Sequence, residues 1–173
     1  MKIILIIIAG FISIINCYSQ SDSLKIQDIL IKTNIIENNT NKEICKHKFK
    51  LDSIDISVIQ FENKIKTINK FSDSKSILNI DYYFVNDQLI MISIIEPSPL
   101  FPEYDIYSYS TLFFEDGKIF KEQSRYTITG PLTGIGIPRD KDKYELFGYN
   151  RSFTNEFLKE YSILLYDKIN EDN

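Results

Sequence analysis

The chain has 173 residues, of which 20 are basic and 24 acidic, so its formal net charge is −4 at pH 7. Charges of both signs are interspersed, and the densest basic segment, residues 46–50, alternates as a strand with one solvated face does. This pattern predicts no concentrated basic surface for nucleic acid, so we expect no nucleic-acid partner. Apolar residues are mainly Ile, Phe and Tyr, which favours strands over helices.

The N-terminal segment has the pattern of a secretory signal peptide. Lys2 precedes an apolar run over residues 3–15 that only Gly10 and Ser13 interrupt. A membrane-spanning helix needs about 20 apolar residues, so this run is too short to be one. We therefore predict a signal peptide over residues 1–19 and a single α+β domain over residues 20–173. The protein is expected to be secreted or periplasmic.

Two processing routes compete at the end of this segment. Small residues at Cys17 and Ser19 suit ordinary signal peptidase, which would leave Gln20 as the N-terminus. The alternative is lipidation of Cys17, because residues 14–17 look like a bacterial lipoprotein box. Asn16 departs from that pattern, which has a small residue before the cysteine, so ordinary cleavage is favoured. A membrane partner, and a membrane-anchored lipoprotein, are expected only if Cys17 is lipidated.

The next segments predict one helix followed by strands. Residues 21–37 have helical spacing of apolar residues, at Ile26, Ile29, Leu30 and Ile36, with Asp22 or Ser23 as the cap. From residue 44 the period changes to two, which predicts half-buried strands with turns at residues 52–53 and 62–64. Cys45 falls on the first of these strands and is expected to be buried.

Two hairpins follow, and a helix closes the chain. Residues 77–85 and 89–95 are apolar on both faces, which is typical of central strands. Residues 107–114 and 119–128 flank an Asp-Gly turn. Residues 155–169 predict a helix capped by Thr154, with an apolar stripe at Phe157, Leu158, Tyr161, Leu164, Leu165 and Ile169. The predicted fold is α+β: an N-terminal helix, an antiparallel β-meander of about six strands, and a C-terminal helix packed on the sheet.

The two hairpins share a pattern of aromatic strands and polar turns. The first has Tyr82-Tyr83-Phe84, then Asn86-Asp87 and Leu89-Ile90, and the second has Leu112-Phe113-Phe114, then Asp116-Gly117-Lys118 and Ile119. This pattern resembles uncharacterised exported bacterial β-meander proteins with Asn/Asp-Gly-Lys turns. The first hairpin departs from it, with Asp87-Gln88 in place of Gly and Lys. The resemblance covers about fifty residues and implies no activity.

Residues that could carry catalysis or bind a metal are few. His47 is the single histidine, no Gly-x-Ser-x-Gly motif is present, and Cys45 with His47 would provide only two metal ligands. Asp140 and Asp142 fall short of a calcium loop. We therefore expect no cofactor, no metal and no enzymatic activity.

Two apolar loops rich in proline and glycine predict a binding surface instead. They span residues 96–105 and 130–138, and their candidate contact residues are Leu100, Phe101, Tyr104, Leu132 and Ile135. The sequence thus favours non-enzymatic binding of an unknown protein or small ligand in the periplasm or outside the cell. One alternative is a secreted hydrolase that uses Glu96, Glu103 or Asp105. The other is an envelope lipoprotein with a structural role.

Overall fold

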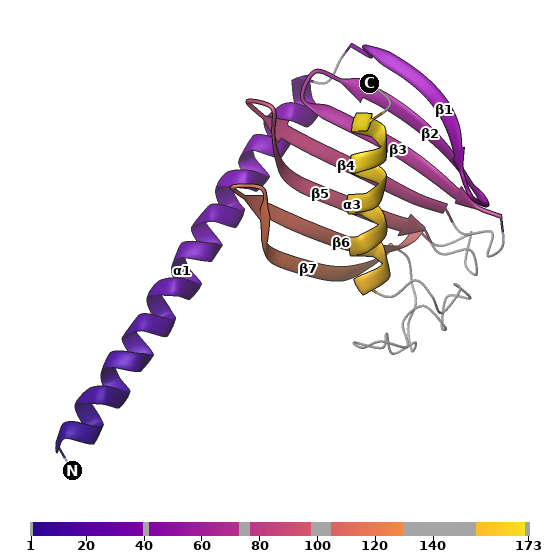
Figure 1. Ribbon diagram of the computed structural model, residues 1–173. Helices are drawn as coiled ribbons and strands as arrows, with labels where there is room; N and C mark the ends of the chain where they lie inside the picture. The colour runs from indigo at the N-terminus through magenta and orange to yellow at the C-terminus, as the bar shows by residue number, and fades with distance from the viewer. Residues whose placement is uncertain (1, 40–41, 73–76, 98–104, 130–154, 172–173) are drawn as a thin grey trace.

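The structure is a computed structural model that describes residues 2–39, 42–72, 77–97, 105–129 and 155–171 (Figure 1). Side chains are described for residues 21–39, 42–72, 77–96, 109–124 and 156–171. The elements in chain order are α1 (Lys2–Asn39), β1 (Cys45–Leu51), β2 (Ile54–Phe61), β3 (Lys64–Phe71), β4 (Ile77–Val85), β5 (Gln88–Pro97), β6 (Asp105–Glu115), β7 (Lys118–Thr129) and α3 (Asn155–Glu171).

The strands form one antiparallel sheet in the order of the sequence, β1-β2-β3-β4-β5-β6-β7. The predicted α+β meander is therefore confirmed, but with seven strands in place of about six. The turns at residues 52–53 and 62–63 are only two residues long. They leave β1, β2 and β3 as three separate strands that pair along almost their whole length. Asp52 adopts a positive φ of 51°, which the first of these turns requires.

The helix α3 lies across one face of the sheet, here called the α3 face (Figure 1). Alternate residues of the strands point to this face and form the larger core with α3. Its members with the least exposure include Val58, Leu78, Ile80, Tyr82, Ile92, Leu165 and Ile169. Burial of these side chains is the main force that holds α3 on the sheet.

Buried hydrogen bonds fix the position of α3 on this core. Tyr82 donates to the carbonyl oxygen of Ser162 at 2.9 Å, and Tyr161 donates to Oδ1 of Asn69 at 2.9 Å. The amide of Asn69 donates in turn to Thr67 Oγ1 at 2.9 Å and to the carbonyl oxygen of Leu78 at 3.1 Å. Because each buried polar group needs a specific partner, this network selects one register of α3 among many apolar alternatives.

The C-terminal part of α1 packs on the opposite face, here called the α1 face, and its N-terminal part extends past the sheet (Figure 1). Ile29 and Ile36 form a second, smaller core with Tyr83, Met91 and Phe113. No helix in the described part of the chain has a segment long and apolar enough to cross a membrane.

The N-terminus of α1 differs from the prediction. We expected a helix to begin near Asp22 or Ser23, but α1 continues through both from Lys2. Helix propagation is favourable once a turn has formed, and no proline interrupts residues 2–39, so neither residue acts as a cap. The helix therefore spans the predicted cleavage site and the predicted first helix without a break.

Three predicted burial positions were wrong. Leu30 on α1 and Leu164 on α3 are 47% and 54% exposed, because each helix contacts the sheet along a stripe narrower than its apolar positions suggest. Cys45 is an exposed free cysteine, since β1 is an edge strand and Cys45 lies at its beginning. The other predicted stripe residues of α3 are buried or partly buried against the sheet.

Candidate functional site

A cleft lies on the α3 face, at the end of the sheet where β4 turns into β5 and β6 turns into β7. Its volume is about 720 Å³, within the range of small-molecule binding sites. We call it the hairpin cleft. It is lined by Gln88, Leu89, Ile90, Ile92, Phe114, Glu115, Asp116, Gly117, Lys118, Ile119, Ile163, Tyr166 and Asp167.

Two hairpins of the same geometry build this end of the sheet. The turn residues Asn86 and Asp87 have φ values of 50° and 62°, and Asp116 and Gly117 have 50° and 74°. Positive φ at both central residues is the requirement of a type I′ turn, which matches the twist of the flanking strands. Asn, Asp and Gly tolerate this conformation better than other residues, which explains why these residues occupy the two turns.

Each hairpin also contains a bulge at the same distance from its turn. The pairing shifts between Tyr83 and Phe84 in the first hairpin and between Phe113 and Phe114 in the second. The extra residue is Ile90 in one return strand and Phe120 in the other, and both pack against the smaller core under α1. A bulge increases the local twist of the strands, so the two turns bend in the same way at the mouth of the cleft.

The cleft has an apolar floor and an aromatic wall. Leu89, Ile92, Phe114 and Ile119 come from the strands, and Ile163 and Tyr166 come from α3. The ring of Tyr166 stacks on Tyr82 and Phe84, with centroid distances of 5.6 and 5.9 Å. Because Tyr82 is fully buried, these contacts hold the wall in one orientation.

The rim of the cleft is charged. Glu115, Asp116, Lys118 and Asp167 line it, and Lys25 of α1 approaches the turn from the other side of the sheet. The ammonium of Lys25 lies 2.6 Å from the carboxylate of Glu115, and this hydrogen bond raises the pKa of Lys25. The β6–β7 turn is therefore tied to α1 as well as to its own strands.

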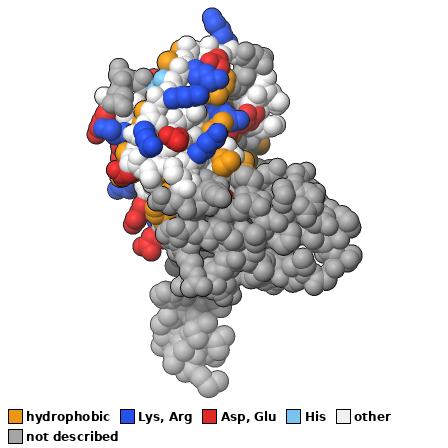
Figure 2. Space-filling view, turned by 90° about the vertical axis from the view of Figure 1, so that its right-hand side faces the viewer, with side chains coloured by type: hydrophobic (Ala, Val, Ile, Leu, Met, Phe, Trp, Pro, Cys, Tyr) orange, Lys and Arg blue, Asp and Glu red, His pale blue; other side chains and the backbone are white. Residues whose placement is uncertain are grey.

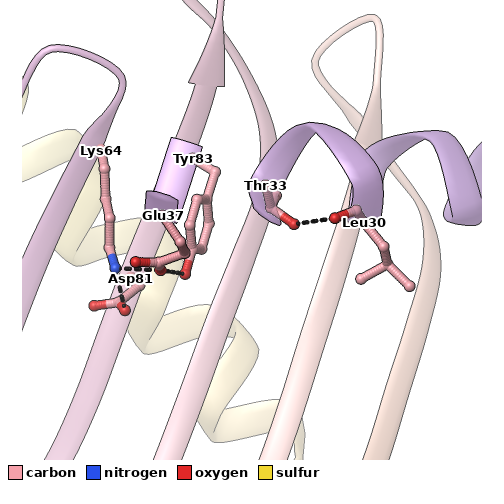
Figure 3. A network of polar contacts seen from close by, with 6 residues as sticks. All are labelled: Leu30, Thr33, Glu37, Lys64, Asp81 and Tyr83. Carbon is pink, nitrogen blue, oxygen red and sulfur yellow. Dashed lines mark hydrogen bonds and ion pairs between the residues drawn. The ribbon is translucent and has the colours of Figure 1, made fainter. Parts of the chain in front are cut away.

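A second polar cluster lies under the C-terminal end of α1 (Figure 3). Lys64 on β3 is 5% exposed, and its ammonium lies 2.5 Å from Glu37 and 2.8 Å from Asp81. Tyr83 donates to the same oxygen of Glu37 at 2.5 Å, and its ring lies 5.1 Å from the ammonium of Lys64. Figure 3 shows these four side chains converging between the helix and the strands.

The protonation states in this cluster follow from burial and from the ion pairs. Burial raises the pKa of Asp81 despite the nearby charge of Lys64. Burial opposes the charge of Lys64, but the carboxylates of Asp81 and Glu37 raise its pKa above the ordinary value. Burial also opposes the charge of Glu37, but hydrogen bonds from Lys64 and Tyr83 lower the pKa of this residue. The cluster is thus an ion-pair network that fastens α1 to the sheet, in which Oδ2 of Asp81 pairs with Lys64 and the buried Oδ1 has no hydrogen-bond partner among the described residues.

The residues predicted from the sequence as a binding surface are not part of the hairpin cleft. Leu100, Phe101, Tyr104, Leu132 and Ile135 lie outside the described residues, so their predicted role stays a prediction. The backbone of Cys17 lies within α1, but its side chain is not described. Lipidation of Cys17 is equally untested.

Of the three carboxylates of the hydrolase alternative, only the side chain of Glu96 is described, so this alternative stays a prediction. Glu96 on β5 is 1% exposed and does not line the hairpin cleft. Glu103 lies outside the described residues, and only the backbone of Asp105 is described. Among the described side chains, no three His, Cys, Asp or Glu residues are close enough to hold a metal ion. His47 instead stacks on Phe49 at a centroid distance of 6.0 Å.

Sequence reasoning missed the hairpin cleft. The available signal was the repetition of the two hairpins together with apolar residues on both of their faces. Comparison of the chain with protein-family models, curated proteins and solved structures finds no match. The site is therefore interpreted from its own geometry.

Proposed function

We propose that this is an exported, non-enzymatic binding protein that holds the apolar part of a small ligand in the hairpin cleft. The observation that carries the proposal is the cleft itself: a volume of about 720 Å³ above an apolar floor, with charged groups confined to the rim. Sites of this kind bind a ligand by burying its apolar surface, while a few polar groups orient it.

Export is supported by the signal-peptide pattern of residues 1–19. A role in binding without catalysis is supported by the character of the cleft residues. Its described side chains are mainly aliphatic and aromatic, and its carboxylates lie at exposed turn and helix positions. Neither the apolar side chains nor these carboxylates provide a nucleophile with an adjacent base, which nucleophilic catalysis would need.

The test is to titrate the purified protein with the fluorescent apolar probe 8-anilinonaphthalene-1-sulfonate and to map the contact by amide NMR shifts. We expect saturable binding with shifts at residues 88–92, 114–119 and 163–167. Ile163→Gln places a polar group in the cleft wall and should weaken binding by about tenfold, the equivalent of about 1.4 kcal/mol.

Leu164→Gln is the matched control. It makes the same chemical change one residue further along α3, at a side chain that is 54% exposed and outside the cleft. We expect this variant to bind as the unchanged protein does. Equal losses in the two variants, or NMR shifts elsewhere, would show that the probe does not report on the hairpin cleft.

A further inference from the structure

The α1 face of β1, β2 and β3 carries an array of five lysines. Residues that pair across antiparallel strands share a face, and the pairing aligns side chains of the three strands in rows. We call this array the lysine grid. Its three rows are Lys46-Ile59-Lys66, Lys48-Ser57-Ile68 and Lys50-Asp55-Lys70.

The grid presents its charges to solvent in two lines. Lys46, Lys48 and Lys50 form the line on β1 and are exposed, and in the line on β3 Lys70 is exposed and Lys66 is half-buried. Strand geometry spaces the three lysines on β1 by about 7 Å, places Lys66 and Lys70 about 13 Å apart on either side of Ile68, and separates the two lines by about 10 Å. Figure 2 views the molecule from the side of the β1 edge and shows basic side chains gathered there, with acidic ones interspersed.

The charge balance of the grid is opposite to that of the whole chain. Five lysines and one aspartate occupy its nine positions, whereas the chain has a net charge of −4. Asp55 lies between the lines, with its carboxylate 3.9 Å from the ammonium of Lys50. Asp81 on β4 lies opposite Lys66 of β3, but its carboxylate forms an ion pair with Lys64. The grid is thus a local basic surface on an acidic protein.

Protection of an edge strand does not explain the whole grid. Lysines on edge strands prevent two sheets from joining, and this role accounts for the line on β1. It does not account for Lys66 and Lys70, because β3 is an interior strand with β2 and β4 on either side. Two lines of cations on either side of β2 instead match a linear polyanion that lies along this strand.

We propose that the lysine grid binds an extended polyanionic polysaccharide, carboxylated or sulfated. Ammonium groups in two lines can follow a chain that carries a negative charge on each repeat, since Lys acts as a point charge and needs no fixed ligand orientation. The central column of Asp55, Ser57 and Ile59 has no aromatic ring on which a base could stack, which disfavours single-stranded nucleic acid. The apolar members of the grid, Ile59 and Ile68, are half-buried and do not project as membrane anchors do.

This inference goes beyond the proposed function, because the grid and the hairpin cleft lie on opposite faces of the sheet. The experiment measures binding of the purified protein to heparin and to polygalacturonate by calorimetry, at low and at physiological salt. We expect binding that weakens as salt rises. The triple variant Lys46→Gln, Lys48→Gln, Lys66→Gln should weaken it by at least about tenfold, because three ion contacts are removed.

The control is a second triple variant, Lys32→Gln, Lys121→Gln, Lys168→Gln. It removes the same net charge from α1, β7 and α3, away from the grid, and should change the affinity by less than about twofold. Asp55→Asn removes the carboxylate between the two lines and should strengthen binding. This gain cannot be produced by a loss of folding.

Equal losses in the two triple variants, or weaker binding of Asp55→Asn, would overturn the proposal. The same titrations with vesicles of anionic lipid and with single-stranded DNA compare the polysaccharide with two other kinds of polyanion. Tighter binding of either of these, lost in the grid variant, would overturn the assignment to a polysaccharide.

Discussion

Lys64 on β3 and Asp81 on β4 form an ion pair of 2.8 Å in which the two side chains are 6% and 15% exposed. Glu37 of α1 completes the network at 2.5 Å from the same ammonium group. Because Lys64 is nearly buried, its charge depends on these two carboxylates for compensation. Lys64 therefore links α1, through Glu37, to the paired strands β3 and β4.

We expect Lys64→Met to lower the free energy of unfolding by about 3–5 kcal/mol, since the variant leaves Asp81 buried without its cation. Chemical denaturation in urea at neutral pH measures this change. The exposed pair Lys32–Asp28 is the control, because its ammonium and carboxylate are also 2.5 Å apart but its side chains are 44% and 59% exposed. Lys32→Met should cost no more than about 0.5 kcal/mol. Similar costs in both variants would contradict the role of burial.

We expect the protein to lose stability steeply above pH 10. Burial raises the pKa of Tyr82, Tyr83 and Tyr161 above the ordinary value of 10.0. Above that pH the unfolded chain loses these protons while the folded chain keeps them, so the free energy of unfolding falls as pH rises. Each such tyrosine contributes a slope of about 1.4 kcal/mol per pH unit.

The variant Tyr82→Phe separates this effect from general alkaline damage. It keeps the ring but removes the hydroxyl that binds the carbonyl oxygen of Ser162, so it should cost about 1 kcal/mol at neutral pH. Above pH 10 the free energy of unfolding should fall less steeply in the variant than in the unchanged protein, and the two slopes should differ by about 1.4 kcal/mol per pH unit. Urea denaturation across this pH range checks both values, and identical slopes would refute the assignment.

The two hairpin turns allow a reciprocal substitution. Asp87 and Gly117 occupy the second central position of equivalent type I′ turns, with φ values of 62° and 74°. Asp87→Gly creates the favoured Asn-Gly turn and should stabilise the protein by about 0.5 kcal/mol. Gly117→Asp should destabilise it by about 1 kcal/mol, because a side chain disfavours positive φ.

No heavy atom lies within 4 Å of the position that a Cβ would take at Gly117, so this pair of variants measures backbone conformation and not a clash. Thermal unfolding of both variants provides the comparison. Shifts of the same sign would show that the two turns are not equivalent.

The processing of the N-terminus is tested by the intact mass of the protein recovered from its native host. We expect the mass of residues 20–173, with or without the loss of ammonia that accompanies cyclisation of Gln20. A mass that begins at Cys17 and includes acyl chains would establish the lipoprotein alternative. The mass of the whole chain would contradict both routes.

Much of the fold follows from local sequence patterns. The period of two in residues 45–61 and the Asp-Gly turn at residues 116–117 each depend on residues close in sequence, and they predicted strands and turns correctly. Burial of single helix positions was less predictable. Leu30 and Leu164 have apolar spacing but are exposed, because the width of the contact depends on how a helix crosses a twisted sheet.

The repeated hairpins were visible in the sequence, but the hairpin cleft that they form with α3 was missed for the same physical reason. It requires the turn at residues 86–87, the turn at residues 116–117 and Tyr166 of α3 to meet, and no local pattern specifies the register of a helix on a sheet. The buried bond between Tyr82 and Ser162, which joins residues 80 positions apart, helps to set that register. The lysine grid was visible in part, since the alternating lysines of residues 46–50 were recognised as one strand face.

The meander order of the sheet has a consequence for how the chain folds. Every strand pairs with its neighbour in sequence, so each pairing closes a short loop and folding should be fast for a sheet of this size. Strands can therefore be added one at a time in chain order. The α3 face stays open until residues 155–171 dock on it, so we expect the packing of this helix to complete the larger core.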